Sequence, residues 1–311
     1  MASKVRTETI YRVDNATGEI IHSQEVYSNT RMELKDELTR EQRDYWKNMN
    51  EHRSMSAKLG GFSMVLYYDN ELLFKKESGL SSATITRLIM LSTFMDFENR
   101  LVKVSPNSTR GKSNENDYFT CLKDFENALK ISKRSIADFM KEARGAGILM
   151  ERDGSFFLSK KYFFRGELPV KLSFTRVYIN SVRDFYYSVK TTQHRTLSYL
   201  FQLMPRVHWE TNYIVKDRDC KRSEMQLMTP YDICEFLGLS RDSSNVSKVT
   251  KDLINFTMVV EGITFPVFSY VKVGNALGVK TYFVINPLFY TSTNNYTHFH
   301  ELLEVLCDTK K

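Results

Sequence analysis

The sequence lacks the features that define several large classes of protein. No apolar run approaches the length of a membrane-spanning helix, and the N-terminus has no apolar signal core. The cysteines are scattered and never form a C-x-x-C pair, so they support neither a zinc site nor a disulfide framework. We therefore expect a cytoplasmic protein with no membrane association, no bound metal and no cofactor.

Catalytic motifs are also scarce. The chain contains no Gly-x-Ser-x-Gly, no His-Glu-x-x-His and no clustered carboxylate pair. Gly111-Lys112-Ser113 is similar to the end of a P-loop, but Pro106 stands where the first glycine of that loop is needed. His298 and His300 match the His-hydrophobe-His core of rolling-circle nucleases, which also need a tyrosine on a later helix. No tyrosine follows His300, so we expect no enzyme and keep metal-dependent nicking through His298 and His300 as a lesser alternative.

The composition is that of a folded protein with an excess of positive charge. The chain has 311 residues, of which 42% are hydrophobic and 26% charged, which gives room for two domains with their own cores. Its net charge of +7 and isoelectric point near 9.0 favour a polyanionic partner.

The stretch from Phe119 to Leu158 predicts a winged helix-turn-helix. A short helix is expected from Asp124 to Lys130, followed by a second helix that Ser132 caps and that runs to about Ala146. Apolar residues at helical spacing give the second helix a buried stripe, formed by Ile136, Phe139, Met140 and Ala143. Two short strands around Asp153-Gly154 then predict a β-hairpin wing. A helix held in this way, with basic residues on its free face, can enter the major groove of DNA.

The same plan recurs later in the chain, which indicates an internal duplication. Three blocks correspond in order: Leu88, Leu91 and Met95 with Leu197, Leu200 and Met204; Ile131-Ser132-Lys133 with Leu239-Ser240-Arg241; and residues 156–164 with 282–290. The second recognition helix is expected from about Ser243 to Phe256, with Ser240 in the capping position. Met258-Val259-Val260 is expected to begin its wing, which is longer than the first.

The remaining segments are expected to extend these two domains. Residues 5–27 predict a β-hairpin, and 31–58 predict a charged helix with Leu34, Leu38, Tyr45 and Met49 on one stripe. That stripe fits either a coiled-coil contact with another subunit or packing on the helix's own domain. Residues 62–74 fit a hairpin or a strand entering a helix. The segment 165–182 predicts a strand or short helix between the halves.

The predicted fold is α+β, with two tandem winged helix-turn-helix domains and an N-terminal hairpin and helix extension. The predicted boundaries are 1–80 for the hairpin, charged helix and connector, 81–168 for the first winged domain, and 169–193 for a linker. The second winged domain, with a C-terminal helix, is expected over 194–311.

Five motifs over residues 5–168 resemble the RepL-type plasmid replication initiators of Gram-positive bacteria. They are the runs 17–21, 67–72, 93–96, 131–136 and 161–166. This resemblance implies sequence-specific binding of duplex DNA without enzymatic activity. RepL-type proteins normally have a single winged domain, and the tandem arrangement is also similar to iteron-binding initiators, whose two winged helices read one extended site.

We therefore predict a protein of plasmid or phage origin that binds double-stranded DNA as a replication initiator or a transcriptional regulator. It would act alone, as a homodimer, or with replication or transcription machinery. The predicted base contacts are Lys133, Arg134, Ser135, Asp138, Arg241, Ser244, Asn245 and Lys248. The predicted phosphate contacts are Lys141, Arg144, Arg152, Lys160, Lys161, Lys251, Lys272 and Lys280. The alternative from another class is a protein–protein adaptor whose basic faces are merely solvated.

Overall fold

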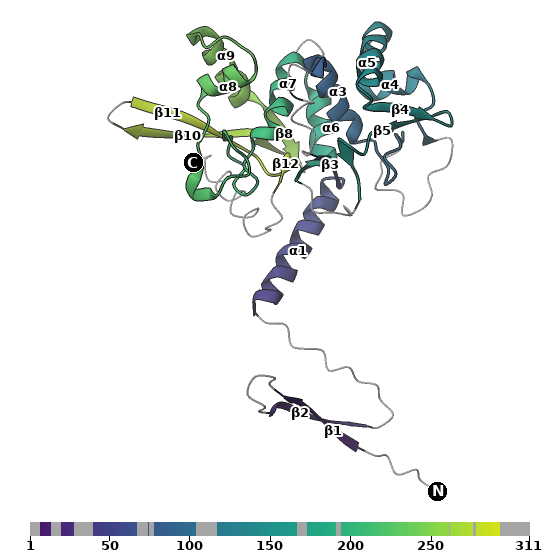
Figure 1. The fold of residues 1–311 in the computed structure, drawn as a ribbon, viewed down its shortest axis with the longest axis vertical. Helices are drawn as coiled ribbons and strands as arrows, with labels where there is room; N and C mark the ends of the chain where they lie inside the picture. The colour runs from purple at the N-terminus through teal and green to yellow at the C-terminus, as the bar shows by residue number, and fades with distance from the viewer. Residues whose placement is uncertain are drawn as a thin grey trace. The chain divides into compact units, whose positions relative to one another are not determined.

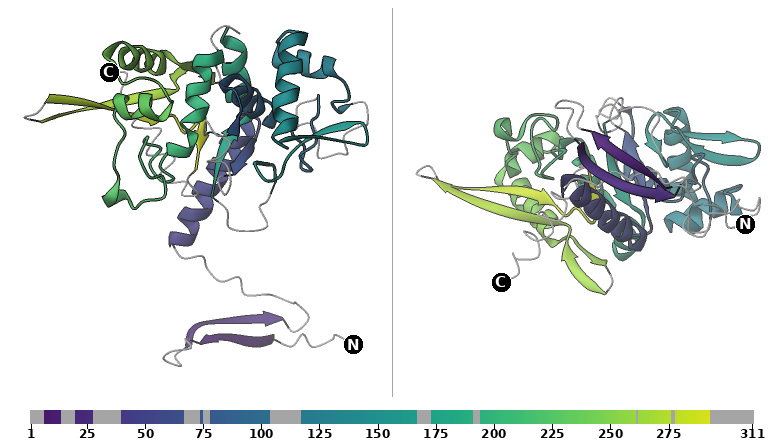
Figure 2. Two further views of the ribbon diagram at one scale, coloured as in Figure 1. Left: turned by 45° about the horizontal axis from the view of Figure 1, so that its top comes forward. Right: turned by 90° about the horizontal axis from the view of Figure 1, so that it is seen from below.

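The structure is a computed structural model with a mixed α+β fold (Figures 1 and 2). It describes residues 7–13, 20–27, 40–66, 74, 78–103, 117–166, 173–190, 194–260, 262–275 and 278–292. The chain divides into two compact units, Met1–Trp46 and Lys47–Lys311, which we call unit 1 and unit 2.

Unit 1 contains the predicted N-terminal hairpin. Strands β1 (Thr7–Val13) and β2 (Ile20–Tyr27) pair in antiparallel register from Thr7 opposite Tyr27, with an irregularity at Arg12 and Val13. The hairpin prediction is therefore confirmed.

Helix α1 (Arg40–Lys58) corresponds to the later part of the predicted charged helix. Met49, His52 and Ser56 lie on one stripe and are buried, and the His52 Nε2 lies 2.8 Å from the Tyr178 hydroxyl in unit 2. Packing on its own domain is therefore the correct alternative for Met49, the last residue of the predicted stripe. Leu34, Leu38 and the side chain of Tyr45 lie outside the described part of the chain. The helix ends at Lys58, two residues before Gly60, whose φ of +81° is a left-handed conformation that suits glycine.

A four-stranded antiparallel sheet joins segments from the whole of unit 2. Its strands are β3 (Phe62–Leu66), β6 (Phe163–Phe164), β7 (Phe174–Tyr178) and β12 (Tyr290–Thr291), in the order β12-β7-β3-β6. β3 and β7 are the central pair, with Met64 opposite Arg176. The segment predicted between the halves thus supplies a central strand and then helix α6 (Ile179–Ser188).

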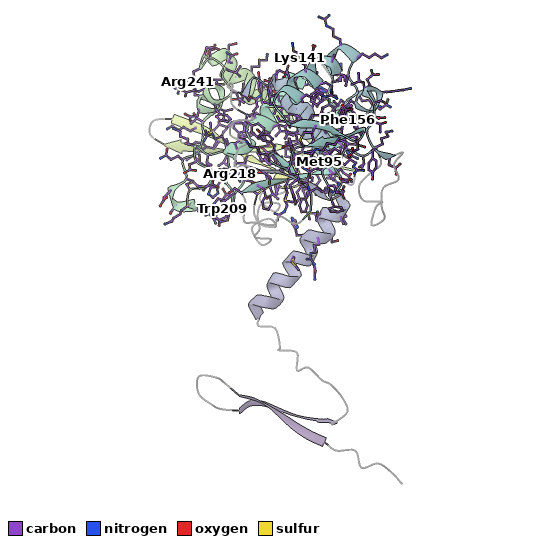
Figure 3. All side chains as sticks on the ribbon, turned by 45° about the vertical axis from the view of Figure 1, so that its right-hand side comes forward. Met95, Lys141, Phe156, Trp209, Arg218 and Arg241 are labelled. Atoms are coloured by element: carbon purple, nitrogen blue, oxygen red, sulfur yellow. The ribbon has the colours of Figure 1, made fainter. Side chains whose placement is uncertain are left out.

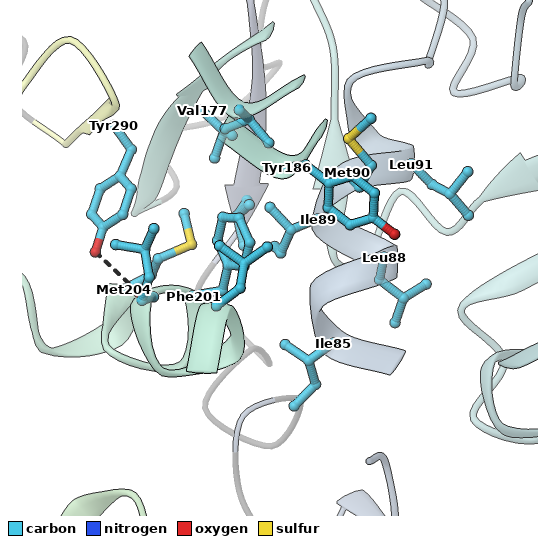
Figure 4. Packing of buried hydrophobic residues seen from close by; sticks show 14 of the residues in the cluster. Ile85, Leu88, Ile89, Met90, Leu91, Val177, Tyr186, Phe201, Met204 and Tyr290 are labelled. Atoms are coloured by element: carbon cyan, nitrogen blue, oxygen red, sulfur yellow. Dashed lines mark hydrogen bonds between the residues drawn. The ribbon is translucent and has the colours of Figure 1, made fainter. Parts of the chain in front are cut away.

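Two helices pack against each other beside this sheet and form the centre of the core. They are α3 (Ser82–Ser92) and α7 (His194–Gln202). Figure 4 shows side chains of α3 and α7 converging with Tyr186 of α6 and Val177 of β7. The Tyr290 hydroxyl donates a hydrogen bond of 3.4 Å to the Leu200 carbonyl, which ties the edge strand β12 to α7.

A first set of elements follows α3. It comprises α4 (Leu122–Leu129), α5 (Lys133–Gly145), β4 (Leu149–Arg152) and β5 (Ser155–Leu158). All four residues predicted for the α5 stripe are buried, and β4 and β5 pair around Asp153 and Gly154, both with positive φ. Helix α4 begins two residues earlier than predicted, because the Asp124 carboxylate accepts hydrogen bonds from the Thr120 and Cys121 amides and so caps its first turn.

A second set follows α7 in a similar order. Two short 3₁₀ helices, η5 (Met204–Arg206) and η6 (Arg222–Glu224), precede α8 (Pro230–Phe236) and α9 (Ser243–Asn255). Four strands then form two hairpins: β8 (Thr257–Val260) with β9 (Ile263–Pro266), and β10 (Phe268–Asn275) with β11 (Gly278–Ile285). The buried stripe of α9 retains Val249 and Leu253 as predicted, whereas Val246 is half-buried.

Asn99 and Asn212 occupy equivalent positions in the two sets. Both are fully buried and have positive φ, 66° and 55°. The Asn99 side-chain amide donates to the carbonyls of Leu158 and Phe163, at 3.2 and 2.6 Å. The Asn212 amide donates to the carbonyls of Ile285 and Tyr290, at 3.2 and 3.1 Å. Each asparagine therefore joins the last hairpin strand of its set to one edge strand of the central sheet, β6 for Asn99 and β12 for Asn212.

These contacts correct the predicted block alignment. Leu158 corresponds to Ile285 and not to Val284, a shift of one residue along the last hairpin strand. Met95, which forms a β-bridge with Leu101, corresponds to Val207, which forms one with Ile214, and not to Met204. The predicted helical match was therefore displaced by about one turn, because the apolar pattern of a helix repeats at that spacing.

The predicted beginning of the second wing is also wrong. In the first set, the Ser159 amide donates to the Ile148 carbonyl just before β4. In the second set, the Asn286 amide donates to the Val267 carbonyl just before β10, so Val267 takes the place of Ile148. Strands β8, which includes Met258, and β9 form a separate hairpin, which has no counterpart between α5 and β4.

Candidate nucleic-acid interface

Helix α5 is held by a cap and by contacts to α3. The Ser132 hydroxyl accepts a hydrogen bond of 3.3 Å from the Ser135 amide, as predicted for the N-cap. Arg87 of α3 donates to the Ser135 carbonyl at 3.2 Å, and the Glu142 carboxylate accepts from the Ser81 amide at 2.8 Å. No local pattern predicts the Arg87 contact, because the residue lies 48 positions before its partner.

Three of the four predicted base-contacting residues of α5 are exposed. Lys133, Arg134 and Asp138 are exposed, whereas Ser135 is half-buried. The Ser135 hydroxyl lies 3.2 Å from that of Ser132, within the capping turn. Lys133 and Arg134 are therefore the side chains of this turn with the greatest reach.

Helix α9 has a different cap from the one predicted. Asp242, and not Ser240, is its N-cap, and the carboxylate accepts a hydrogen bond of 2.7 Å from the Asn245 amide. Hydrogen bonds from the Ser240 hydroxyl and the Asn245 amide lower the pKa of Asp242, so the cap is charged near neutral pH. The Asn245 side-chain amide also donates to Ser240 and Asp242, at 2.7 and 3.1 Å.

The position of this cap changes one predicted equivalence. Because Asp242 corresponds to Ser132, the counterpart of Lys133 is Ser243, and Arg241 lies in the turn before α9. Arg241 is exposed and lies 3.4 Å from the Glu235 carboxylate. The other predicted base contacts of this set, Ser244, Asn245 and Lys248, lie on the first two turns of α9; Asn245 is half-buried and the other two are exposed.

The predicted phosphate-contacting residues are all exposed: Lys141, Arg144, Arg152, Lys160, Lys161, Lys251, Lys272 and Lys280. They come from α5, α9, the two hairpins β4–β5 and β10–β11, and the turn after β5. Arg144 forms an ion pair of 2.5 Å with Glu151, which holds its guanidinium against β4. Such an exposed pair contributes little to stability, so the cost of exchanging Glu151 for a phosphate is small.

The helices α5 and α9 lie on one side of unit 2, with α3 and α7 between them (Figures 1 and 2). Figure 3 shows Lys141 and Arg241 toward this side, whereas Trp209 and Arg218 lie toward the opposite side. The structure therefore brings the two predicted recognition helices to a common surface.

A groove of about 630 Å³ lies between α3 and α5 on this side of unit 2. Its charged lining consists of Arg87, Lys141, Asp138 and Glu142, so cations and carboxylates are balanced. This balance gives the groove itself no preference for an anion.

The alternative catalytic and loop predictions fall outside the described residues, which end at residue 292 and omit 104–116. His298, His300 and Gly111-Lys112-Ser113 are among them. Within the described part of the chain, no group of three or more His, Cys, Asp or Glu residues is placed to hold a metal ion. No helix in the same ranges has both the length and the apolar character needed to cross a membrane.

Comparison with known proteins gives no relative from which a function could be transferred. The chain matches no family model, no curated protein and no solved structure.

Proposed function

We propose that this chain is a sequence-specific double-stranded DNA-binding protein built from two tandem winged helix-turn-helix domains. The support is the repeated order of a core helix, a short capped helix, a longer capped helix and a hairpin, in α3-α4-α5-β4-β5 and again in α7-α8-α9-β10-β11. The equivalent asparagines Asn99 and Asn212 support the same reading.

The observation that carries the proposal is the exposure of α5 and α9 on one side of unit 2. In each domain the shorter helix and the buried stripe hold the longer helix, which leaves its opposite face for the major groove. Lys and Arg on these faces would supply affinity through phosphates, while Arg134 and Lys248 would reach base edges. Asn245 can read adenine only if its amide leaves Ser240 and Asp242, so we assign it a smaller share of specificity than Arg134.

The two domains would read different sequences. The first turn of α5 carries Lys133 and Arg134 where α9 carries Ser243 and Ser244. Arg and Lys pair with guanine in the major groove, whereas serine is less selective. The proposed site is therefore asymmetric, with its guanine-rich half under α5, and spans about two helical turns.

The proposed biological role is replication initiation or transcriptional regulation for a plasmid or phage, as the resemblance to RepL-type initiators suggests. Both roles use the same readout surface. The position of the bound sites, in direct repeats at an origin or across a promoter, distinguishes them.

Selection of bound duplexes from native genomic fragments tests the proposal. Arg134→Ala is expected to weaken binding to the selected site about tenfold and to relax preference at one guanine. Asn245→Ala should alter preference only in the other half of the site, and less strongly. Arg53→Ala is the matched control, because Arg53 is exposed on α1, away from α5 and α9.

Salt dependence separates this function from a protein–protein adaptor. Neutralising several phosphates makes the logarithm of affinity fall linearly with that of salt concentration, with a slope of about −0.9 for each phosphate. Affinity for duplex DNA that stays flat between low and high salt, with unchanged preference in Arg134→Ala, would favour the adaptor.

A further inference from the structure

Helix α6 lies between the two sets of elements and belongs to neither. It follows the central strand β7 and packs against both α3 and β8 (Figure 1). Its residues Phe185, Tyr186 and Tyr187 are consecutive, so their side chains leave the helix about 100° apart and reach neighbours on different sides of it. This arrangement lets α6 contact both sets at once.

Two tyrosine hydroxyls of α6 hold the end of α4. The Tyr186 hydroxyl donates a hydrogen bond of 2.9 Å to the Leu129 carbonyl, and the Tyr187 hydroxyl donates one of 2.8 Å to the Ala128 carbonyl. Both carbonyls belong to the last turn of α4, where a helix has no backbone donors of its own for them. Burial raises the pKa of both hydroxyls, so each remains a protonated donor near neutral pH.

The carbonyls that α6 holds come just before the start of α5. Leu129 is the last residue of α4, and α5 begins at Lys133, directly after its cap. The connection between the two helices is therefore only three residues long, and Lys130 within it has a φ of 52°. A displacement of α6 relative to α4 would be passed on to the first turn of α5, which carries Arg134.

On its other side, α6 holds the end of α9. The Phe185 ring lies 5.2 Å from the Phe256 ring and 5.4 Å from the Phe289 ring, and both contacts are edge-to-face. Phe256 is the C-cap of α9, and the strand β8 that follows it packs along α6. The Ser181 hydroxyl adds a hydrogen bond of 2.8 Å to the Leu288 carbonyl. Because edge-to-face contacts are directional, this cluster fixes the orientation of the end of α9 as well as its position.

We infer that α6 sets the separation of the two recognition helices and so restricts the protein to one spacing between its two half-sites. Packing of α3 on α7 joins the cores of the two sets, whereas α6 contacts the ends of α4 and α9 directly. Phe185, Tyr186 and Tyr187 are then positioning residues, which determine the spacing without touching DNA. The inference rests on the proposed DNA-binding function and adds to it a requirement on the target.

The test compares duplexes that differ only in the spacing of the half-sites. One base pair added or removed between the halves of the selected site shifts them by about 3.4 Å and rotates them by about 34°. A protein with a fixed separation can bind such a duplex only by deforming it, so the wild-type chain is expected to bind it about tenfold more weakly than the selected site. Fluorescence anisotropy of labelled duplexes measures both affinities with the full chain.

Variants at each end of α6 should relax this requirement. Tyr186→Phe/Tyr187→Phe removes both hydroxyls but keeps both rings, and it should reduce the spacing penalty to about threefold. Affinity for the selected site itself should fall only about twofold, because the contacts with DNA remain. Phe185→Leu weakens the link to α9 and should reduce the spacing penalty in the same direction.

The matched control is Tyr231→Phe on α8. Tyr231 is 46% exposed and Tyr187 is 44% exposed, so removal of either hydroxyl perturbs a similar surface, but the control should keep the full spacing penalty. A variant that merely destabilises the chain lowers the concentration of folded protein. It therefore weakens binding to every duplex by the same factor and leaves the ratio between spacings unchanged.

The outcomes separate this inference from the function beneath it. If the wild type binds no duplex selectively, both fail. If it binds the selected site but tolerates altered spacing equally well, the fixed separation is overturned and the DNA-binding function stands. The role of α6 is also overturned if the tyrosine and phenylalanine variants keep the wild-type ratio between spacings, whatever their affinity for the selected site.

Discussion

Replacing Asn99 or Asn212 tests whether the two sets of elements are built in the same way. Each asparagine side chain donates to two carbonyls, one on the last hairpin strand and one on the edge strand of the central sheet. Alanine removes both hydrogen bonds, at about 1 kcal/mol each, because the carbonyls are left without this donor. It also removes the short polar side chain that makes asparagine more tolerant of positive φ than alanine, which costs a further 1 kcal/mol or so. The expected loss of unfolding free energy is therefore about 3 kcal/mol at each site.

Glycine separates the two contributions. Asn99→Gly and Asn212→Gly lose the same hydrogen bonds but tolerate positive φ, so the expected loss is about 2 kcal/mol. Urea unfolding of the full chain, followed by circular dichroism, measures these differences from the midpoint and the slope. The reasoning is refuted if alanine is no more destabilising than glycine, or if the Asn99 and Asn212 variants differ by much more than 1 kcal/mol.

Three further predictions concern the framework that supports α5 and α9. Arg183→Lys should lower the unfolding free energy by roughly 2 kcal/mol. The Arg183 guanidinium donates to the side chain and to the carbonyl of Thr93 at the end of α3, and lysine cannot make both contacts. An unchanged urea midpoint would contradict this prediction. Burial opposes ionisation of Asp232, but hydrogen bonds from Thr229 lower its pKa overall. The charged Asp232 cap should therefore stabilise the folded protein above about pH 4, and this stabilisation should be lost as pH falls through the folded pKa. Asp232→Asn should remove this dependence from acid titrations. Burial and then the charge of Arg87 lower the pKa of His194 in the folded protein. Stability should therefore fall as pH drops below about 6.5, because the His194 imidazole is protonated in the unfolded state before it is protonated in the folded state. His194→Gln should flatten this part of the plot of stability against pH.

Local patterns allowed the sequence to predict most of α5 and its surroundings. The stripe of Ile136 and Phe139 and the Ser132 cap depend on residues within one or two helical turns, and both were confirmed. The turn at Asp153-Gly154 was predicted for the same reason, because positive φ at these two positions is a local preference. The exposed positions of Arg134 and Lys141 follow directly, since they lie opposite the buried stripe.

The cap of α9 and the start of the second hairpin were predicted wrongly, because in each case one local sequence pattern fitted two positions along the chain. The turn before α9 contains Ser240 and Asp242, which are both good helix caps, and only the hydrogen bond from the Asn245 amide identifies Asp242. Met258 and Val267 both begin apolar strand segments after α9. Their partners, β9 and β11, decide which one corresponds to the first hairpin.

Neighbours within a few positions were enough to predict α5, its Ser132 cap and the basic residues on its free face. The pairing of β3 with β7, more than a hundred residues away along the chain, is evident only in the folded molecule. The same is true of the position of α5 and α9 on one side of unit 2. The same holds for the paired roles of Asn99 and Asn212. Each of these features depends on hydrogen bonds and packing between distant segments, and the periodicity of a single segment does not specify its distant partner.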